Sequence, residues 1–268
     1  MADWSLARED LSKREREGFR PVPHERAQGV LGHGKSYLRR LADLQFGSIW
    51  RDLRVLFPQV QGTIADVGCG AQPFRDLLRA DVRYIGLDID AAEEKFGYRT
   101  ADIRPIRGEL LPLDDGEVDA VLCTETLEHV LEPRSLLREI ERALKPGGRL
   151  ILTVPFAARW HFIPHDYWRY TPAALRHLLV EAGLNEVRVY ARGGALAVAA
   201  YKALGLVLLL LAGHGHRGIA VAPWRVAGVC LLPLGLIAIL AGQVGIRFPG
   251  PAEDTLGYTV LARKPARA

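Results

Sequence analysis

The stretch "TIADVGCGAQPFRDLLRADVRYIGLDID", Thr63–Asp90, decides the fold. A short apolar run that ends near Asp66 is followed by a turn with Gly68 and Gly70, then by a helical stretch and a second apolar run that ends at Asp88. Short apolar runs separated by helices indicate a βαβ unit with parallel strands. Because the carboxyl ends of parallel strands share one edge of the sheet, both acids and the glycine turn are expected there.

The alternation continues along the chain. Further expected strands are "VDAVLC", "RLILTVPF", "EVRVYA" and "GYTVLARK", and further expected helices are "SLLREIERAL" and "TPAALRHLLVEAGL", with Thr171 as the N-cap of the latter. We therefore predict an α/β fold, a doubly wound, Rossmann-like and mostly parallel sheet. The expected divisions are an arm with amphipathic helices over 1–57, a core over 58–192 and 255–268, and an apolar helical hairpin inserted over 193–254.

The glycine spacing separates two classes of cofactor. A glycine turn with an acid about 20 residues further on suits several adenosyl cofactors, because the acid accepts from ribose hydroxyls. A dinucleotide fingerprint also needs glycine or alanine three residues after its second glycine, and this chain has Pro73 there. The turn therefore does not favour a pyrophosphate.

An ordered set of motifs carries a family resemblance: "DVGCG", "GLDID", "ADI", "LPLDDGEVDAVLCTETLEHV", "LREIERALKPGGRLILTVPF" and "HDYWRYTPAALRHLLVEAGL". In this order they resemble the class I S-adenosylmethionine-dependent methyltransferases, and the last is similar to a bacterial subgroup in which an Asp-Tyr-x-Arg-Tyr-Thr segment follows the fifth strand. The resemblance implies a seven-stranded sheet with an antiparallel last strand, and S-adenosyl-L-methionine as cofactor.

The resemblance also implies roles for single residues. Asp66 would lie near the cofactor's ammonium group, Asp88 would accept from both ribose hydroxyls, and Asp102 would receive the adenine amino group. The full set of implied cofactor-binding residues is Asp66, Gly68, Cys69, Gly70, Asp88, Ile89, Asp102, Thr124 and Glu125.

Catalysis at such a site is mainly positional, and a general base is needed only when the acceptor must lose a proton. The candidate bases are His129, His161 and His165. The candidate substrate-lining residues, from the segment after the fifth strand, are Trp160, Asp166, Tyr167 and Tyr170. His161 and His165 have the spacing of a helical metal pair, but Pro164 between them disfavours a regular helix, so no metal site is predicted.

A rival motif precedes the core. "GVLGHGKS", Gly29–Ser36, matches the pattern of a phosphate-binding P-loop. A P-loop follows a buried strand, whereas the preceding "FRPVPHERAQ" carries two prolines, three charged residues and a histidine. A nucleotide-binding protein is therefore kept only as an unlikely alternative.

The apolar region contains Val226–Ile246, a charge-free run long enough to span a bilayer. An earlier stretch around Ala203–Gly213 reaches that length only if Lys202 extends to an interface. Since a last strand must still join the sheet, the chain has to return to the side it left. We therefore expect a membrane-embedded hairpin, with Val226–Ile246 as its returning arm, in preference to a soluble helical cap or dimer interface.

Composition completes the expectations. The 268 residues carry a net charge of +4, which does not favour nucleic acid, and between Gly193 and Gly250 every charged residue is basic, which suits an anionic membrane surface. Three scattered cysteines argue against disulfides and zinc motifs, and the charged N-terminus lacks a signal-peptide pattern. We expect a methyltransferase at the cytoplasmic face of a membrane, acting on a lipid-like or lipid-linked acceptor, with oxygen as the first choice of atom; the alternative is a non-catalytic membrane-docked binding protein.

Overall fold

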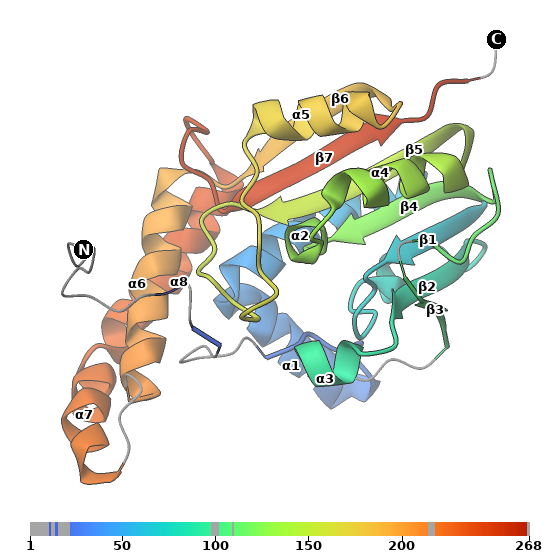
Figure 1. The fold of residues 1–268 in the computed structure, drawn as a ribbon. Helices are drawn as coiled ribbons and strands as arrows, with labels where there is room; N and C mark the ends of the chain where they lie inside the picture. The colour runs from blue at the N-terminus through green and yellow to red at the C-terminus, as the bar shows by residue number, and fades with distance from the viewer. Residues whose placement is uncertain are drawn as a thin grey trace, which may run out of the picture.

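The computed structural model describes residues 11, 14–15, 22–97, 102–108, 110–213 and 218–266, so of the expected N-terminal region most of residues 1–21 lies outside it. One seven-stranded sheet forms the centre, in the order β3-β2-β1-β4-β5-β7-β6 (Figure 1). The strands are β1 Thr63–Val67, β2 Arg83–Ile89, β3 Ile103–Ile106, β4 Val118–Thr124, β5 Leu144–Pro155, β6 Asn185–Arg192 and β7 Gly257–Arg263. Only β7 runs in the direction opposite to the other six strands, which confirms the predicted fold class.

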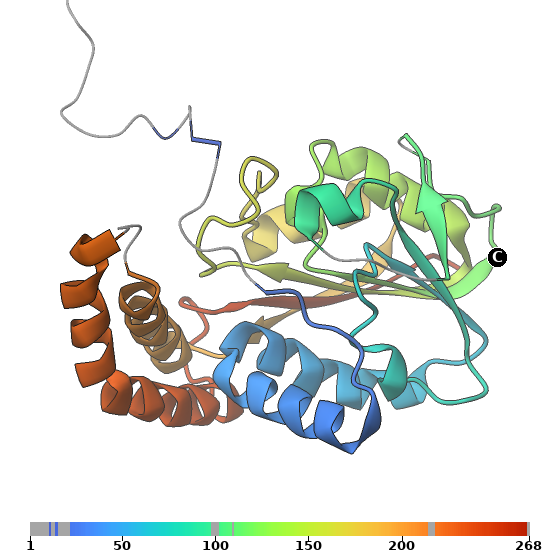
Figure 2. The ribbon, with the colours of Figure 1, turned by 90° about the horizontal axis from the view of Figure 1, so that it is seen from below.

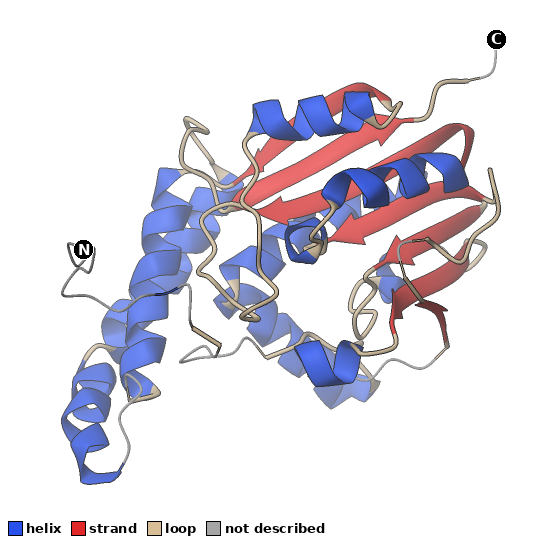
Figure 3. Ribbon diagram, viewed as in Figure 1, coloured by secondary structure: helices blue, strands red, loops and turns tan. Residues whose placement is uncertain are grey.

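Helices cover both faces of the sheet (Figures 2 and 3). One face carries α4 Pro133–Ala143 and α5 Pro172–Glu181, and the other carries α1 Gly29–Ala42 and α2 Leu44–Leu56. The alternation of side chains along β1 divides the core accordingly: Ala65 packs on the α4 side, and Ile64 on the α2 side. A short helix, α3 Ala92–Phe96, follows β2.

Two local predictions have clear outcomes. Thr171 caps α5 as predicted, because its side chain accepts from the backbone N–H of Ala174. The predicted helix over "PFRDLLRA" is wrong, since only a 3₁₀ turn, η3 Arg75–Leu77, forms there. The chain leaves the glycine turn through Pro73, and the segment is too short to extend that turn into a stable helix.

The P-loop alternative fails on geometry. Gly29–Ser36 lies inside α1, where the backbone N–H groups beyond the first turn bond within the helix, and residues 22–28 before it contain no strand. A phosphate-cradling loop is therefore not formed at this motif.

The apolar insertion lies between β6 and β7. It consists of α6 Ala195–Leu211, the turn η5 Gly218–Val221, α7 Ala222–Cys230 and α8 Leu232–Arg247. The expected returning arm, Val226–Ile246, is bent, because α7 and α8 meet at an angle of 52°. Pro233, at the start of α8, lacks an N–H and its ring clashes with the carbonyl four residues earlier, which ends α7.

Among the described residues, no single helix is both long and apolar enough to cross a bilayer, while α7 and α8 together pass that test by length and composition. The insertion packs as an antiparallel pair of α6 against α8, and α8 also contacts α2. Gln243 donates to the Leu41 carbonyl at 2.8 Å, and Arg51 donates to the Ile246 carbonyl at 2.9 Å. The insertion is thus anchored to the core at its base.

Candidate active site

The glycine turn after β1 is held against the end of β2. The backbone N–H groups of Gly68 and Cys69 both donate to the Leu87 carbonyl, at 2.8 and 3.0 Å. Gly68 has a φ of +70°, and a Cβ added there would overlap the Thr126 side chain. Only glycine fits this position, which leaves the turn open to a ligand that approaches its backbone.

Asp88 holds this turn in place through the hydrogen bonds of its side chain. Its side chain is buried, one carboxylate oxygen accepts from the Gly70 N–H at 2.9 Å, and the other accepts from the Ile89 N–H at 2.8 Å. A carboxylate oxygen accepts up to two hydrogen bonds, so Asp88 has the chemistry that ribose hydroxyl groups require. The arrangement fits the ribose role that the resemblance implies.

Asp66 carries an unsatisfied oxygen. Its Oδ2 accepts from the Tyr84 hydroxyl at 2.7 Å, while its Oδ1 is buried without a hydrogen-bond partner among the described residues. Burial raises the pKa of Asp66 to about 7, the charge of Asp88 adds to this, and the Tyr84 hydrogen bond opposes it. A buried carboxyl group with a free oxygen next to the glycine turn is suited to an ammonium group, so the residues present fit the methionine end of the cofactor.

The position of Asp102 does not support its predicted adenine role. Asp102 is exposed and comes immediately before β3, whose Ile103 pairs with Gly86 and whose Pro105 pairs with Asp88. At about 3.3 Å per residue, Asp102 lies roughly 10 Å back from the edge that carries Asp88. The residue was misplaced because the sequence pattern did not show that β3 begins after it.

Glu125 is fixed by a buried arginine. Its Oε1 accepts from Arg192 Nη2 at 2.7 Å and from the Thr153 hydroxyl at 3.0 Å, directly after Thr124 at the end of β4. The side chain of Arg192 is fully buried and also donates to the Val154 carbonyl and to Ser48. Glu125 is therefore a fixed negative charge at the edge where the reacting end of the cofactor is expected.

The segment after β5 is tied down by side chains that were expected to face a substrate. Both oxygens of Asp166 are engaged by Arg169, at 2.6 and 2.7 Å, and Arg169 keeps the pKa of Asp166 below its usual range against the effect of burial. Tyr170 is buried and donates to the Leu127 carbonyl at 3.1 Å. These two residues are structural. Trp160 is half-buried and Tyr167 is exposed, so both remain candidates for lining an acceptor pocket.

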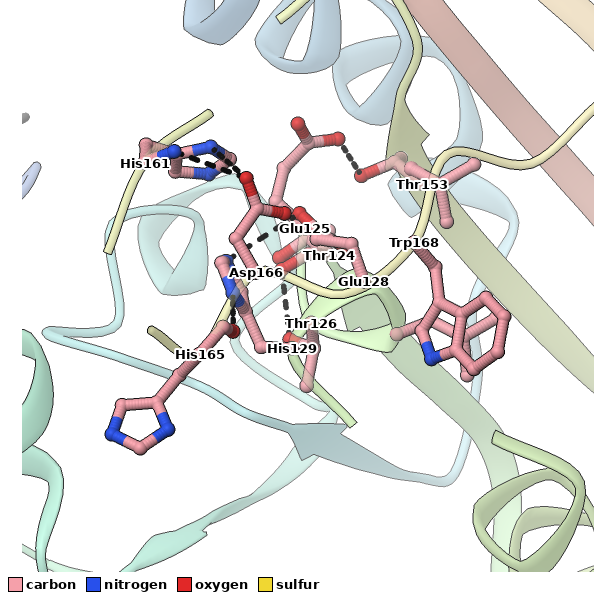
Figure 4. A network of polar contacts seen from close by, with 12 residues as sticks. Thr124, Glu125, Thr126, Glu128, His129, Thr153, His161, His165, Asp166 and Trp168 are labelled. Atoms are coloured by element: carbon pink, nitrogen blue, oxygen red, sulfur yellow. Dashed lines mark hydrogen bonds and ion pairs between the residues drawn. The ribbon is translucent and has the colours of Figure 1, made fainter. Parts of the chain in front are cut away.

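The three candidate bases have different surroundings (Figure 4). Burial lowers the pKa of His129 to about 4, with His161 contributing, so His129 is neutral at pH 7 and a weak base. The ring of His161 lies next to that of His129, with 5.0 Å between centroids, whereas the ring of His165 points away from both. Of the three, His165 is the one that does not join the cluster.

Two buried ionisable residues at the site were not identified from the sequence. Glu128 is fully buried beside His129, and burial together with the charge of Glu125 raises its pKa well above the usual value. Arg192, the last residue of β6, forms an ion pair with Glu125, which follows β4. An acid inside the apolar run "LEHV", and an arginine at the end of a strand, were the available signals.

Comparisons with known proteins agree with this geometry. Residues 65–152 match the family described as a methyltransferase domain. A probable S-adenosylmethionine-dependent methyltransferase of Mycolicibacterium smegmatis is 36% identical over 97 residues, covering 34% of this chain and 37% of the relative. A ubiquinone biosynthesis O-methyltransferase of Xanthomonas oryzae is 33% identical over 107 residues, covering 34% of this chain and 41% of the relative. The matched segments span about 40% of the length of these relatives.

Solved structures share the fold. A SAM-dependent methyltransferase from Archaeoglobus fulgidus superposes with a TM-score of 0.50 at 17% identity, covering 81% of this chain and 93% of that one. The [4+2]-cyclase SpnF superposes with a TM-score of 0.51 at 21% identity, covering 91% of this chain and all of that one. The family match and the fold confirm the predicted resemblance: the core is a methyltransferase domain of the class I, S-adenosylmethionine-dependent type.

Proposed function

We propose that this chain, whose core is a class I methyltransferase domain, transfers a methyl group from S-adenosyl-L-methionine to an oxygen of a lipid-like or lipid-linked acceptor at the cytoplasmic face of a membrane. The single observation that carries the acceptor class is the apolar surface of the helical insertion, at the same edge of the sheet as the glycine turn.

The methyl-transfer part rests on the site. The cofactor would supply an activated methyl group, so the protein has to place the acceptor in line rather than activate the donor. The backbone at Gly68 and Gly70 admits the methionine end, Asp66 offers a buried oxygen to its ammonium group, and Asp88 offers acceptors to the ribose. Cys69 and Ile89 take part through their backbone N–H groups: that of Cys69 donates to the Leu87 carbonyl, and that of Ile89 donates to the Asp88 carboxylate.

The acceptor part rests on how α8 is packed. Its buried residues are small, whereas its large apolar residues face outward, the reverse of a soluble amphipathic helix. The buried residues are Gly235, Ala238, Gly242 and Gly245, and the exposed ones include Leu232, Leu234, Leu236, Ile237, Leu240 and Val244. Small residues inside and large apolar residues outside are the pattern of helices that pack within lipid.

The topology brings this surface to the site. β6 runs parallel to β5, so its last residue, Arg192, lies at the carboxyl edge, and α6 starts three residues later. Lys202 of α6 donates to the Ala157 carbonyl, just after β5, which joins the insertion to the segment over the site. A lipid-embedded insertion would therefore hold the site close to the membrane surface. The name of the Xanthomonas relative, an O-methyltransferase of ubiquinone biosynthesis, supports oxygen as the acceptor atom.

The direct test is transfer of a labelled methyl group. Purified protein and labelled cofactor are incubated with separate fractions of membrane lipids, lipid-linked glycans and water-soluble metabolites. Label that enters an alkali-stable, organic-extractable product of the lipid fraction supports the proposal. Transfer confined to water-soluble metabolites would overturn the acceptor class.

The alternative, a binding protein of the same fold without transfer, is separated by the same experiment. The fold alone does not decide between them, since the [4+2]-cyclase SpnF shares it. Cofactor binding without transfer to any fraction would favour that alternative.

Cofactor affinity is expected to depend on the protonation of Asp66. The carboxyl has a pKa of about 7 because of its burial, and a cationic ammonium group binds the carboxylate form, so a bound proton must be lost first. The dissociation constant for S-adenosylhomocysteine, measured by calorimetry, should rise about tenfold per pH unit below pH 7 and level off above it. Asp66→Asn should bind more weakly at pH 8 and show a flat profile from pH 5.5 to 8; an unchanged profile in this variant would remove Asp66 from the ammonium site.

Membrane binding is expected to depend on the outer face of α8. Ile237 and Leu240 are 60% and 61% exposed. Ile237→Glu and Leu240→Glu should each reduce flotation with phosphatidylglycerol-containing vesicles by about tenfold or more, because a charged side chain in lipid costs about 2.5–3.5 kcal/mol. Leu131→Glu, at a residue 62% exposed outside the insertion, is the matched control and should float like wild type. Recovery of the wild-type protein in the soluble fraction without detergent would refute membrane attachment.

A further inference from the structure

Three side chains converge beside the candidate active site. Glu128 and His129 lie in the turn η4 Leu127–His129 after β4, and His161 comes from the segment between β5 and α5. One carboxylate oxygen and one nitrogen from each ring lie within 4.8 Å of one another (Figure 4). Two elements far apart in the sequence thus deliver three potential metal ligands to one point.

Glu128 needs a partner that the described residues do not supply. Its side chain is fully buried, and neither carboxylate oxygen has a hydrogen-bond partner among the described residues. The Nε2 atom of His129 lies 3.7 Å from Oε1, too far for a hydrogen bond. Because an unpaired buried carboxylate is costly, either a proton or a cation must neutralise it.

Both rings are held with one nitrogen free. His129 Nδ1 lies 2.6 Å from the His165 carbonyl oxygen, and His161 Nδ1 lies 2.9 Å from the Arg159 carbonyl oxygen and 3.0 Å from Asp166 Oδ2. These oxygens can only accept, so each Nδ1 carries the hydrogen and each Nε2 keeps its lone pair.

Arg169 also lies near His161 Nδ1, but at 3.5 Å, farther than either acceptor, and it is engaged by Asp166. The chain Arg169, Asp166 and His161 therefore fixes the orientation of this ring. A carboxylate or carbonyl behind each imidazole is the arrangement that surrounds protein metal ligands.

Apolar rings enclose the cluster. Phe96 lies 5.5 Å from His129 between ring centroids, and Phe162 lies 5.6 Å from His129 and 5.3 Å from His161. These rings exclude water from one side of the cluster, and electrostatic attraction to a cation is stronger in such surroundings.

We propose that Glu128, His129 and His161 bind one divalent first-row transition-metal ion of the zinc type. Two imidazoles and one carboxylate suit zinc, iron and cobalt, whereas magnesium and calcium prefer oxygen ligands. Three protein ligands leave at least one coordination position open, as in catalytic rather than structural zinc sites. The sequence did not predict this site because the second histidine comes from the turn after β4 rather than from His165.

The open coordination position could be occupied by the acceptor during methyl transfer. A metal-bound hydroxyl oxygen of the acceptor would lose its proton more easily than a free one, which removes the need for a strong general base. This use rests on the proposed transfer to oxygen, whereas metal binding itself does not.

The test is metal binding by tag-free full-length protein. After treatment with a chelator, the protein is titrated with Zn²⁺ in a competition assay and with Co²⁺ in a spectroscopic one. One equivalent of each should bind, and Co²⁺ should give visible absorption bands of a coordinated ion. Glu128→Gln and His161→Gln should weaken Zn²⁺ binding by about 100-fold or more and change the Co²⁺ spectrum, and Asp166→Asn by about 10- to 100-fold.

The matched control is His165→Gln, which removes a ring from the same segment but keeps the carbonyl that accepts from His129. It should bind Zn²⁺ like wild type. Circular dichroism and S-adenosylhomocysteine binding verify that each variant is folded. Absence of stoichiometric binding in folded wild type, or equal weakening in His165→Gln, would overturn the metal site. Metal binding without methyl transfer would leave this inference standing and count against the proposed function.

Discussion

Gly68→Ala is expected to weaken cofactor binding strongly. A non-glycine residue at φ +70° costs about 1–2 kcal/mol, and the added Cβ overlaps the side chain of Thr126. Thr126 cannot move aside freely, since its hydroxyl lies 3.0 Å from the Thr124 carbonyl oxygen and 3.3 Å from that of Val67. The turn must therefore shift, and S-adenosylhomocysteine affinity measured by calorimetry should fall by about 100-fold or more.

The matched control is Gly147→Ala. Gly147 also has a positive φ, +78°, but a Cβ there meets no heavy atom within 4 Å. It should lose about 1–2 kcal/mol of stability and bind the cofactor normally. The double variant Gly68→Ala/Thr126→Gly should regain part of the affinity, because the overlap is relieved. Binding by Gly68→Ala within threefold of wild type would show that the turn is not the cofactor site.

Arg192→Met is expected to give the largest loss of stability. The Arg192 side chain is fully buried and serves Glu125, Ser48 and the Val154 carbonyl. Its removal leaves a partly buried carboxylate without its cation, so the free energy of unfolding in urea should fall by about 3–5 kcal/mol. Arg192→Met/Glu125→Gln should recover part of that loss because the unpaired charge is gone.

Arg263→Met is the comparison for this effect. Arg263 pairs with Glu186 at 3.5 Å, and both side chains are about half exposed. An exposed pair contributes about 0–1 kcal/mol, so this variant should remain close to wild type. A similar loss of unfolding free energy in both variants would mean that burial does not make the Arg192 ion pair more important than an exposed one.

Six of the seven strands could be predicted from the sequence because they are short apolar runs, and the period of two along β1 matches the two cores, whereas β3, "IRPI", was missed. The ends of the strands were less certain. The family resemblance implied an adenine-binding role for Asp102, yet β3 begins after this residue. A sequence motif around one residue does not determine the register between β2 and β3, because the register depends on how the two strands pair in three dimensions.

Predictions for single site residues had two outcomes: some residues fit their expected roles, and others are engaged by other groups of the protein. Gly68 and Asp88 are placed by two consecutive paired strands, β1 and β2, and their geometry fits their expected roles. Asp166 and Tyr170 are polar and aromatic residues near the site, but Arg169 and the Leu127 carbonyl engage them. The partner of Asp166 is only three residues away, whereas the contact between Tyr170 and Leu127 joins residues that are 43 apart, which no local spacing rule contains.

The position of β7 has a consequence for the order of folding. β7 pairs with both β5 and β6, yet it follows the whole apolar insertion in the chain. During synthesis β5 and β6 therefore wait with unpaired edges until α6, α7 and α8 have been made. The apolar helices emerge before the sheet can close, so we expect them to meet a membrane or one another first, and the domain to complete its core on an insertion that is already placed.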